Sequence, residues 1–232
     1  MKIKLPKSVV VFFQGWIFSL LVAVLIATSI KSAIADWNTV PTGSMKPTIV
    51  EGDRIFVNKL AYDLKVPYTT FHIAEWDNPK RGEIVVFYSP EDGKRLVKRV
   101  VGTPGDTIFM NDSQLFINGK QLTYRHPDTQ DFINYLVGDE YREDTFIENL
   151  NDKSHPVMFI QHPAVLSSFA PITVPEGKYF MMGDNRYNSA DSRFFGFVDR
   201  DSIVGQATAI VISLDINNMY KPRFDRFFTG LP

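Results

Sequence analysis

The chain has 232 residues, no cysteine, and 25 Lys and Arg against 26 Asp and Glu, which gives a formal net charge of −1. The absence of cysteine excludes disulfides, thiolate metal sites and cysteine nucleophiles. The near-neutral charge argues against a nucleic-acid binder that works through bulk electrostatics. The length suits one large domain or two small ones with a real hydrophobic core.

The first predicted element is a membrane anchor. Residues 9–30 form a run of 22 residues without a charge, of which 17 are apolar, and a helix that spans a bilayer needs about 20 mostly apolar residues. Lys2, Lys4 and Lys7 precede the run without any acid, and basic flanks tend to stay cytoplasmic. We therefore expect residues 1–8 to be cytoplasmic, 9–30 to span the membrane and the remainder to lie outside.

Two other interpretations of this segment remain open. Ala33-Ile34-Ala35 before Asp36 resembles the small-x-small site of a cleaved secretory signal. The apolar region of such signals is usually about 7–15 residues, however, which is shorter than this run. A buried core helix is the third interpretation. Outside the run and its lysines, residues 31–232 carry 22 basic and 26 acidic residues, so nucleic acid is a poor candidate partner.

The rest of the chain is predicted to be mostly β. Runs rich in β-branched and aromatic residues between turn residues are typical of strands, and Asn118-Gly119 is a typical hairpin turn. No long stretch after residue 36 has a helical apolar period. The expected strands are 53–57, 82–88, 96–101, 115–117, 120–122, 178–182 and 203–214.

The segment between the expected strands 96–101 and 178–182 differs in composition. Residues 123–156 are rich in polar and acidic side chains. We expect a β core of residues 37–106 and 178–232, with residues 107–177 inserted as a smaller β-rich lobe. The alternative is one continuous sheet with long loops.

Histidine does not indicate a site. The four histidines are His72, His126, His155 and His162, and no two have the close spacing of metal ligands. We interpret each as a surface or loop residue, expect no metal and no cofactor, and note that a triad with any of them is not excluded, because triad members are distant in sequence.

Three other motifs carry possible chemistry. Ser44 lies in a Gly- and Pro-rich turn, PTGSMKPT, just after the apolar run. Lys98 falls inside an apolar strand pattern, where burial would lower its pKa and suit it to act as a general base for a serine; an outward-facing lysine is the alternative. Residues 183–193, GDNRYNSADSR, form a polar loop in which Asp191 and Arg193 are positioned to pair.

These motifs, in this order behind an apolar N-terminal run, closely resemble the bacterial type I signal peptidases. The matching text is PTGSMKPTIVEGDRIFVNKLAYDLKVP at 41–67, GEIVVF at 82–87, KRVVGTPGD at 98–106 and GDNRYNSADSRFFGFV at 183–198. That family consists of membrane-bound serine endopeptidases that remove N-terminal signal peptides from exported preproteins after small-x-small motifs. The resemblance implies a mainly β fold with an antiparallel core behind one transmembrane helix.

The resemblance also assigns roles to individual residues. Ser44 corresponds to the nucleophile and Lys98 to the neutral-lysine general base. Thr42 corresponds to a hydroxyl donor of the oxyanion hole, beside the Ser44 N–H, and Ser189 to the serine that orients the lysine amine. The supporting residues are Gly183, Asp191 and Arg193. The residues that would line shallow pockets for small substrate side chains are Val40, Met45, Ile49, Ile55, Val86 and Val97.

The resemblance further implies location and partners: a single-pass protein of the bacterial cytoplasmic membrane, with its catalytic domain on the outer side. Its partners would be signal peptides and membrane lipid, without nucleic acid. The aromatic and basic tail 219–228 would lie at the lipid interface or pack on the β core. Other Ser-Lys proteases, namely self-cleaving repressors or pilin-processing enzymes, and a silent β module that binds export partners are the competing functions.

Overall fold

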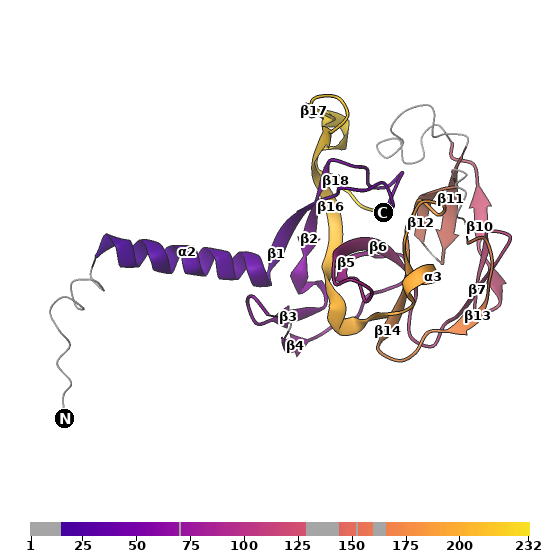
Figure 1. Ribbon diagram of the computed structural model, residues 1–232, viewed down its shortest axis with the longest axis horizontal. Coiled ribbons are helices and arrows are strands. Elements are labelled where there is room, and N and C mark those ends of the chain that lie inside the picture. Colours follow the sequence, from indigo (N-terminus) through magenta and orange to yellow (C-terminus); the bar gives the residue numbers. More distant parts are fainter. Residues whose placement is uncertain (1–14, 70, 129–143, 152, 160–165) are drawn as a thin grey trace.

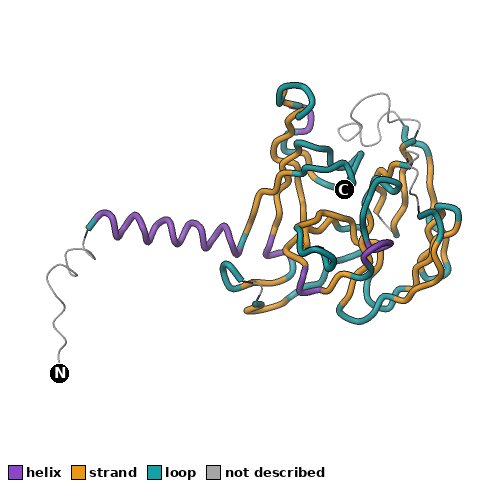
Figure 2. Tube along the Cα trace, in the orientation of Figure 1, coloured by secondary structure: helices purple, strands orange, loops and turns teal. Residues whose placement is uncertain are grey.

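The computed structural model describes residues 15–69, 71–128, 144–151, 153–159 and 166–232. It begins with helix α2, Trp16–Ala33, which projects from one end of the molecule (Figure 1). Beyond α2, regular structure is nearly all β, and helix is limited to single turns (Figure 2), which confirms the mainly β prediction. These turns are η1 (Lys59–Ala61), α3 (Ser192–Phe195), η3 (Arg200–Ser202) and η4 (Phe224–Arg226).

Helix α2 overlaps the predicted anchor but does not coincide with it. The helix starts at Trp16 and continues to Ala33, three residues past the apolar run. Residues 9–14 lie outside the described part of the chain. Within the described residues, no helix combines the length and the apolar character that crossing a membrane requires. The predicted span over residues 9–30 is therefore not confirmed.

The largest sheet contains nine strands, and its strand pairs are antiparallel. Its order is β1-β2-β16-β5-β6-β14-β15, with β17 and β18 added to β16. The bounds are β1 Ala35–Thr39, β2 Asp53–Asn58, β5 Ile84–Tyr88, β6 Arg95–Gly102, β14 Lys178–Met182, β15 Val198–Asp199, β16 Ile203–Asp215, β17 Lys221–Pro222 and β18 Thr229–Gly230. The expected strands 53–57, 82–88, 96–101, 178–182 and 203–214 all appear here.

Strand β16 runs through the middle of this sheet and bends it. It pairs with β5 near Ile203 and Gln206 and with β2 from Gln206 to Ser213, and its register shifts in both pairings. Such irregularities bend a strand and increase its twist. The two faces differ in their partners: Val86 of β5 belongs to one apolar cluster with Val40 and Ile55, whereas Val85 and Phe87 belong to another.

The described strands of residues 107–177 form two smaller sheets. One has the order β13-β7-β8-β9 and the other β10-β11-β12. Asn118 and Gly119, at the predicted hairpin turn, both have positive φ, 52° and 77°. The bounds are β7 Thr107–Asn111, β8 Gln114–Ile117, β9 Lys120–Gln121, β10 Thr123–Arg125, β11 Thr145–Leu150, β12 Lys153–Met158 and β13 Phe169–Thr173, with a further β3–β4 pair, Asp63–Lys65 and His72–Glu75.

These smaller sheets share an apolar core with the large one. A single buried cluster contains Val101 of β6 and Phe180 and Met182 of β14, together with Ile108 of β7 and Leu115 of β8. The division into a catalytic core and an inserted lobe at 107–177 consequently stays a prediction, because the core does not separate where the sequence boundary was expected.

The C-terminal tail packs through its backbone and two arginines, Arg223 and Arg226, while three of its aromatic rings stay exposed. Strands β17 and β18 pair with β16, and the buried Arg226 side chain bonds Asp53 at 2.7 Å. Tyr220, Phe224 and Phe228 are 65%, 74% and 78% exposed. Both sequence interpretations of this tail therefore retain support.

Truncating the shared core should destabilise the protein more than truncating its surface. Leu115 is fully buried, so Leu115→Ala is expected to lower the free energy of unfolding by about 2–5 kcal/mol. Ile73→Ala, at a 58% exposed position on β4, should change it by less than about 0.5 kcal/mol. Denaturant titration of the detergent-solubilised protein measures both values. Equal values would contradict the shared core.

Candidate active site

Ser44 and Lys98 lie in direct contact. Ser44 sits in the turn that follows β1, and Lys98 is on β6. The Lys98 Nζ donates to Ser44 Oγ at 2.6 Å and also contacts the Val97 carbonyl at 3.1 Å. Lys98 is 3% exposed, so this side chain is buried and does not face outward. A hydroxyl and an amine this close, shielded from water, can exchange a proton.

Burial also sets the protonation of Lys98. Desolvation lowers the pKa of Lys98 to about 8, the Arg193 cation adds to this effect, and the carboxylates of Asp191 and Asp184 oppose it. No ion pair joins Lys98 to an acid among the described residues. The lysine is therefore poised to lose its proton near neutral pH.

The 183–193 loop forms hydrogen bonds to the turn that carries Ser44. The Asn185 backbone N–H donates to the Ser44 carbonyl at 3.1 Å, and its side-chain amide donates to the Gly43 carbonyl at 3.1 Å. The Thr48 hydroxyl donates to the Asp184 carboxylate. These three contacts fix the turn that presents Ser44, from a segment more than 130 residues away in sequence.

Gly183 allows the loop to approach this closely. A Cβ on Gly183 would lie 2.3 Å from Ser189 Oγ and 2.4 Å from the Ser44 carbonyl oxygen. Ser189 is thereby brought next to the site, but within the described residues its buried hydroxyl makes no hydrogen bond to Lys98. Its predicted bond to the Lys98 amine is thus absent from the contacts that these residues make.

Asp191 and Arg193 pair as the sequence suggested. Arg193 Nε and Nη2 each donate to the Asp191 carboxylate at 2.8 Å, and Asp191 also accepts from the Gly183 N–H at 3.0 Å. Burial favours a raised pKa for Asp191, but Arg193 and the Gly183 N–H outweigh it and the pKa is lowered. The carboxylate therefore stays charged and holds both ends of the loop.

A buried charge network behind the loop was not predicted. Arg99 donates to both oxygens of Asp184, at 2.9 and 2.7 Å, and Arg186 donates to both oxygens of Glu148, at 2.6 Å each. His155 Nε2 lies between the two acids, 3.3 Å from Glu148 and 3.8 Å from Asp184. The network joins β6, the 183–193 loop, β11 and β12.

The interpretation of His155 as a surface or loop residue is wrong. It is fully buried on β12, and burial together with the nearby Arg99 lowers the pKa of His155, against the opposing effect of Glu148 and Asp184. Glu148 and His155 are directly opposite in the β11–β12 pairing. Glu148 lies three residues before Asn151 and His155 four residues after it, so a hairpin turn at this point was the available sequence signal. His126 is exposed, His72 is partly buried, and His162 lies outside the described residues.

The two groups predicted to donate to an oxyanion are both unengaged within the described residues. The Ser44 backbone N–H donates no hydrogen bond within the described residues, and the Thr42 side chain is exposed and likewise makes none there. Two unengaged donors therefore lie on either side of Gly43, where an anionic oxygen beside Ser44 could accept from them.

The six residues predicted to line pockets share one apolar cluster. Val40, Met45, Ile49, Ile55 and Val86 are buried in it, and Val97 packs against it. Met45 and Val97 are chain neighbours of Ser44 and Lys98, so the cluster begins at the reacting pair. Its role as a substrate pocket stays a prediction.

One group of side chains within the described residues has metal-ligand spacing. Single ligand atoms of His72, Glu75 and Asp201 lie within 4.8 Å of one another. Glu75 and Asp201 are exposed, and Asp63 also faces the imidazole at 3.5 Å. Among the described residues, none of these four side chains contacts Ser44 or Lys98.

Adding one methyl group at Gly183 should disrupt the contact between loop and turn. Because the new Cβ would overlap a backbone oxygen, Gly183→Ala should lower the free energy of unfolding by about 1–3 kcal/mol. Gly230→Ala is the matched control, since its Cβ meets no atom within 4 Å. Thermal and denaturant unfolding measure both variants, and equal stability would contradict the close approach.

Comparison with known proteins places the chain in a family. The model of the family "Signal peptidase, peptidase S26" matches residues 13–212. A signal peptidase I of Buchnera aphidicola (subsp. Schizaphis graminum) is 33% identical over 88% of this chain and 76% of its own. Signal peptidase I P of Bacillus subtilis subsp. natto is 35% identical over 86% and 89%. A crystal structure of a signal peptidase I from Enterococcus faecalis is 33% identical, covers 57% of this chain and 98% of its own, and has a TM-score of 0.36. From the family model and the sequence relatives, the chain belongs to the signal peptidases of family S26 and is a hydrolase of that family.

Proposed function

We propose that this protein is a membrane-bound serine endopeptidase that cleaves N-terminal signal peptides from exported preproteins after small-x-small motifs. Ser44 is the nucleophile and Lys98 is the general base. The observation that carries the proposal is the 2.6 Å contact between Ser44 Oγ and the buried Lys98 Nζ. Family membership supplies the substrate class, because relatives over most of the chain are named signal peptidase I.

The first step follows from the geometry of the pair. Neutral Lys98 accepts the Ser44 hydroxyl proton while Oγ attacks the carbonyl carbon of the scissile peptide. At pH 7, a lysine with a pKa of about 8 is neutral in about a tenth of the molecules. Ser44 Oγ thus has a base within hydrogen-bond distance.

The later steps use the same atoms. The Ser44 N–H and the Thr42 hydroxyl stabilise the tetrahedral oxyanion. Protonated Lys98 then gives its proton to the leaving amine, which breaks the C–N bond and leaves an acyl group on Ser44. Lys98 next deprotonates a water molecule that attacks the ester, and returns the proton to Oγ. Ser189, next to the site, orients the Lys98 amine when that amine is protonated.

The substrate adds to the sheet as an extended strand. Among the described residues, β1 pairs on one edge only, with β2, and residues 95–98 of β6 pair only with β5. Both strands run towards the reacting pair, one ending before Ser44 and the other reaching Lys98. Extended peptides bind free strand edges through main-chain hydrogen bonds. The edges of β1 and β6 therefore guide the scissile bond to Ser44.

Small side chains are selected by the apolar cluster next to the pair. Val40, Ile55 and Val86 are buried in one apolar cluster against which Val97 packs. In this proposal their branched side chains lie under the substrate strand and leave only shallow space there. Substrate residues −1 and −3 point to this face, because side chains alternate along a strand. Large side chains at these positions are excluded.

The apolar segment 9–30 anchors the enzyme in the bacterial cytoplasmic membrane, with residues 1–8 on the cytoplasmic side and the catalytic domain outside. Large apolar side chains of α2 are exposed, among them Leu20, Val24 and Leu25 at 54%, 52% and 60%. Lipid is the environment that suits such a surface. Anchoring keeps enzyme and membrane-held substrate at high local concentration. The exposed tail aromatics rest at the lipid interface.

The chain has two structural parts in this proposal. Residues 37–106 and 178–232 form the catalytic core, and residues 107–177 form the inserted lobe. The lobe supports the catalytic loop, because Glu148 and His155 of β11 and β12 contact Arg186 and Asp184.

Removing either member of the pair should abolish cleavage. Ser44→Ala and Lys98→Ala should each lower kcat by at least about a thousandfold, and the double variant should be no worse than either, because the two act as a unit. Exposed Ser154→Ala and Lys120→Ala serve as controls and should keep normal rates. Cleavage of a model preprotein by the detergent-solubilised enzyme measures the effect, and full activity in both site variants would refute the pair.

The rate should increase with pH. Since Lys98 acts in its neutral form, log kcat/KM should rise with unit slope below its pKa of about 8 and level off above it. The apparent pKa in kcat should be lower still, because bound substrate removes further water from Lys98. A profile flat from about pH 5 to 9 would contradict a neutral-lysine base.

A further inference from the structure

An arginine connects the two free strand edges at the end away from the reacting pair. Arg95, the first residue of β6, places Nη1 3.1 Å from Asp36 Oδ2 and donates to Asn38 Oδ1 at 2.8 Å, both on β1. Its Nη2 donates to the hydroxyl of Tyr88 on β5 at 3.2 Å. Arg95 is thus held by three residues of two other strands, while its side chain stays 36% exposed.

Strand alternation places this group on the face that would meet the substrate. Arg95 and Val97 are two residues apart on β6, so they share a face. Asn38 of β1 is two residues before Val40, which follows the end of β1 and still bonds Asp53 through its backbone, so this pair also shares a face. Val97 and Val40 belong to the apolar cluster. Along this face, the apolar cluster is therefore followed by a group of polar side chains around Arg95. This polar rim consists of Arg95, Asp36, Asn38 and Tyr88.

The rim carries an excess of positive charge. The Asp36 carboxylate is shared between Arg95, at 3.1 Å, and Lys59, at 3.6 Å. The positive charge of Arg95 lowers the pKa of Lys59, in the same direction as the larger effect of burial. One carboxylate facing two cations leaves one positive charge uncompensated.

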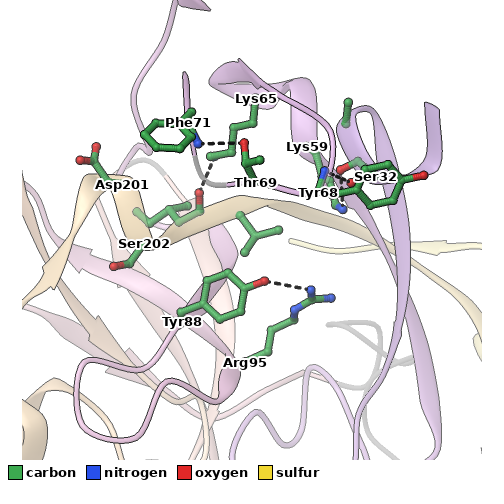
Figure 3. A pocket seen from close by; sticks show the side chains of 13 residues that line it. Ser32, Lys59, Lys65, Tyr68, Thr69, Phe71, Tyr88, Arg95, Asp201 and Ser202 are labelled. Atoms are coloured by element: carbon green, nitrogen blue, oxygen red, sulfur yellow. Dashed lines mark hydrogen bonds between the residues drawn. The ribbon is translucent and has the colours of Figure 1, made fainter. Parts of the chain in front are cut away.

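Arg95 also borders open space. A cavity of about 500 Å³ is lined by Tyr88 and Arg95 on one side and by Lys65 and Phe71 on the other (Figure 3). Its charged lining consists of Lys59, Lys65 and Arg95 with one acid, Asp201. Lys65 is paired with Asp63, which also binds Arg200. A substrate side chain can therefore reach the guanidinium without displacing the core.

The spacing of residues along an extended strand identifies which substrate side chain reaches Arg95. Arg95 precedes Lys98 by three residues, which is about 10 Å along an extended strand. Residues −1, −3 and −5 of an extended substrate point to the same face, and −5 lies about 13 Å from −1. With −1 and −3 over the apolar cluster, the −5 side chain comes to Arg95.

Resting on the proposed function, we propose that Arg95 is a specificity-determining residue that reads substrate position −5 and favours an acidic over a basic side chain there. Asp36 and Asn38 hold its guanidinium in place across the two strands. The selected feature is charge, in contrast to the size selection at −1 and −3.

The test uses three preproteins that differ only at −5, with Glu, Gln or Lys, and the full-length enzyme in detergent. For the unaltered enzyme, kcat/KM should be about fivefold higher with Glu than with Lys, the upper end for a partly exposed ion pair, and high salt should reduce this ratio. Arg95→Gln should bring the ratio near one, Arg95→Glu should invert it, and Arg95→Lys should keep it.

Arg54→Gln is the matched control, an exposed arginine on β2 of the same sheet, and should keep the ratio of the unaltered enzyme. Equal cleavage of all three preproteins, or an unchanged ratio in Arg95→Glu, would overturn the role assigned to Arg95 but leave the proposed function standing. Failure to cleave any of the three would instead overturn the proposed function, on which the assignment rests.

Discussion

The buried ion pair between Arg99 and Asp184 holds the reacting pair in place. Asp184 receives both guanidinium contacts of Arg99 and the hydroxyl of Thr48, and its backbone carbonyl accepts from Met158. One residue thus joins the lysine strand, the serine turn and β12. Removing one partner of such a pair leaves a buried charge uncompensated, which typically costs about 3–5 kcal/mol.

Lys98 and Arg99 are adjacent, equally buried cations with opposite surroundings. Arg99 meets its carboxylate directly, whereas the acids nearest to Lys98, Asp191 and Asp184, are each already bound to an arginine. Those arginines reduce the electrostatic stabilisation that the two carboxylates give to protonated Lys98. Burial then dominates the pKa of Lys98, so the same strand holds one arginine in an ion pair and one lysine whose pKa is lowered.

Local patterns predicted the main strands of the large sheet and the Asn118-Gly119 turn, because these depend on neighbours in sequence. They did not predict β1, β7 or the strands β10 to β13, and the pairing of the Ser44 and Lys98 motifs came from the family resemblance. The network of Glu148, His155 and Arg186 escaped prediction for a physical reason. Acidic and polar residues usually indicate solvent exposure, and only long-range pairing makes their burial tolerable. Likewise, nothing local reveals that Arg95 reaches Asp36, since that contact depends on how the sheet bends.

The junction between α2 and β1 has a mechanical consequence. A single residue, Ile34, separates the helix from the strand that leads to Ser44. Lys59 contacts the Ser32 carbonyl at 2.9 Å, its N–H donates to the Ile34 carbonyl, and the Tyr68 N–H donates to the Ser32 hydroxyl. Three hydrogen bonds thus fix the end of α2 to the β domain, and one residue separates the helix from β1. The direction of the helix and that of the strand that leads to Ser44 are therefore linked.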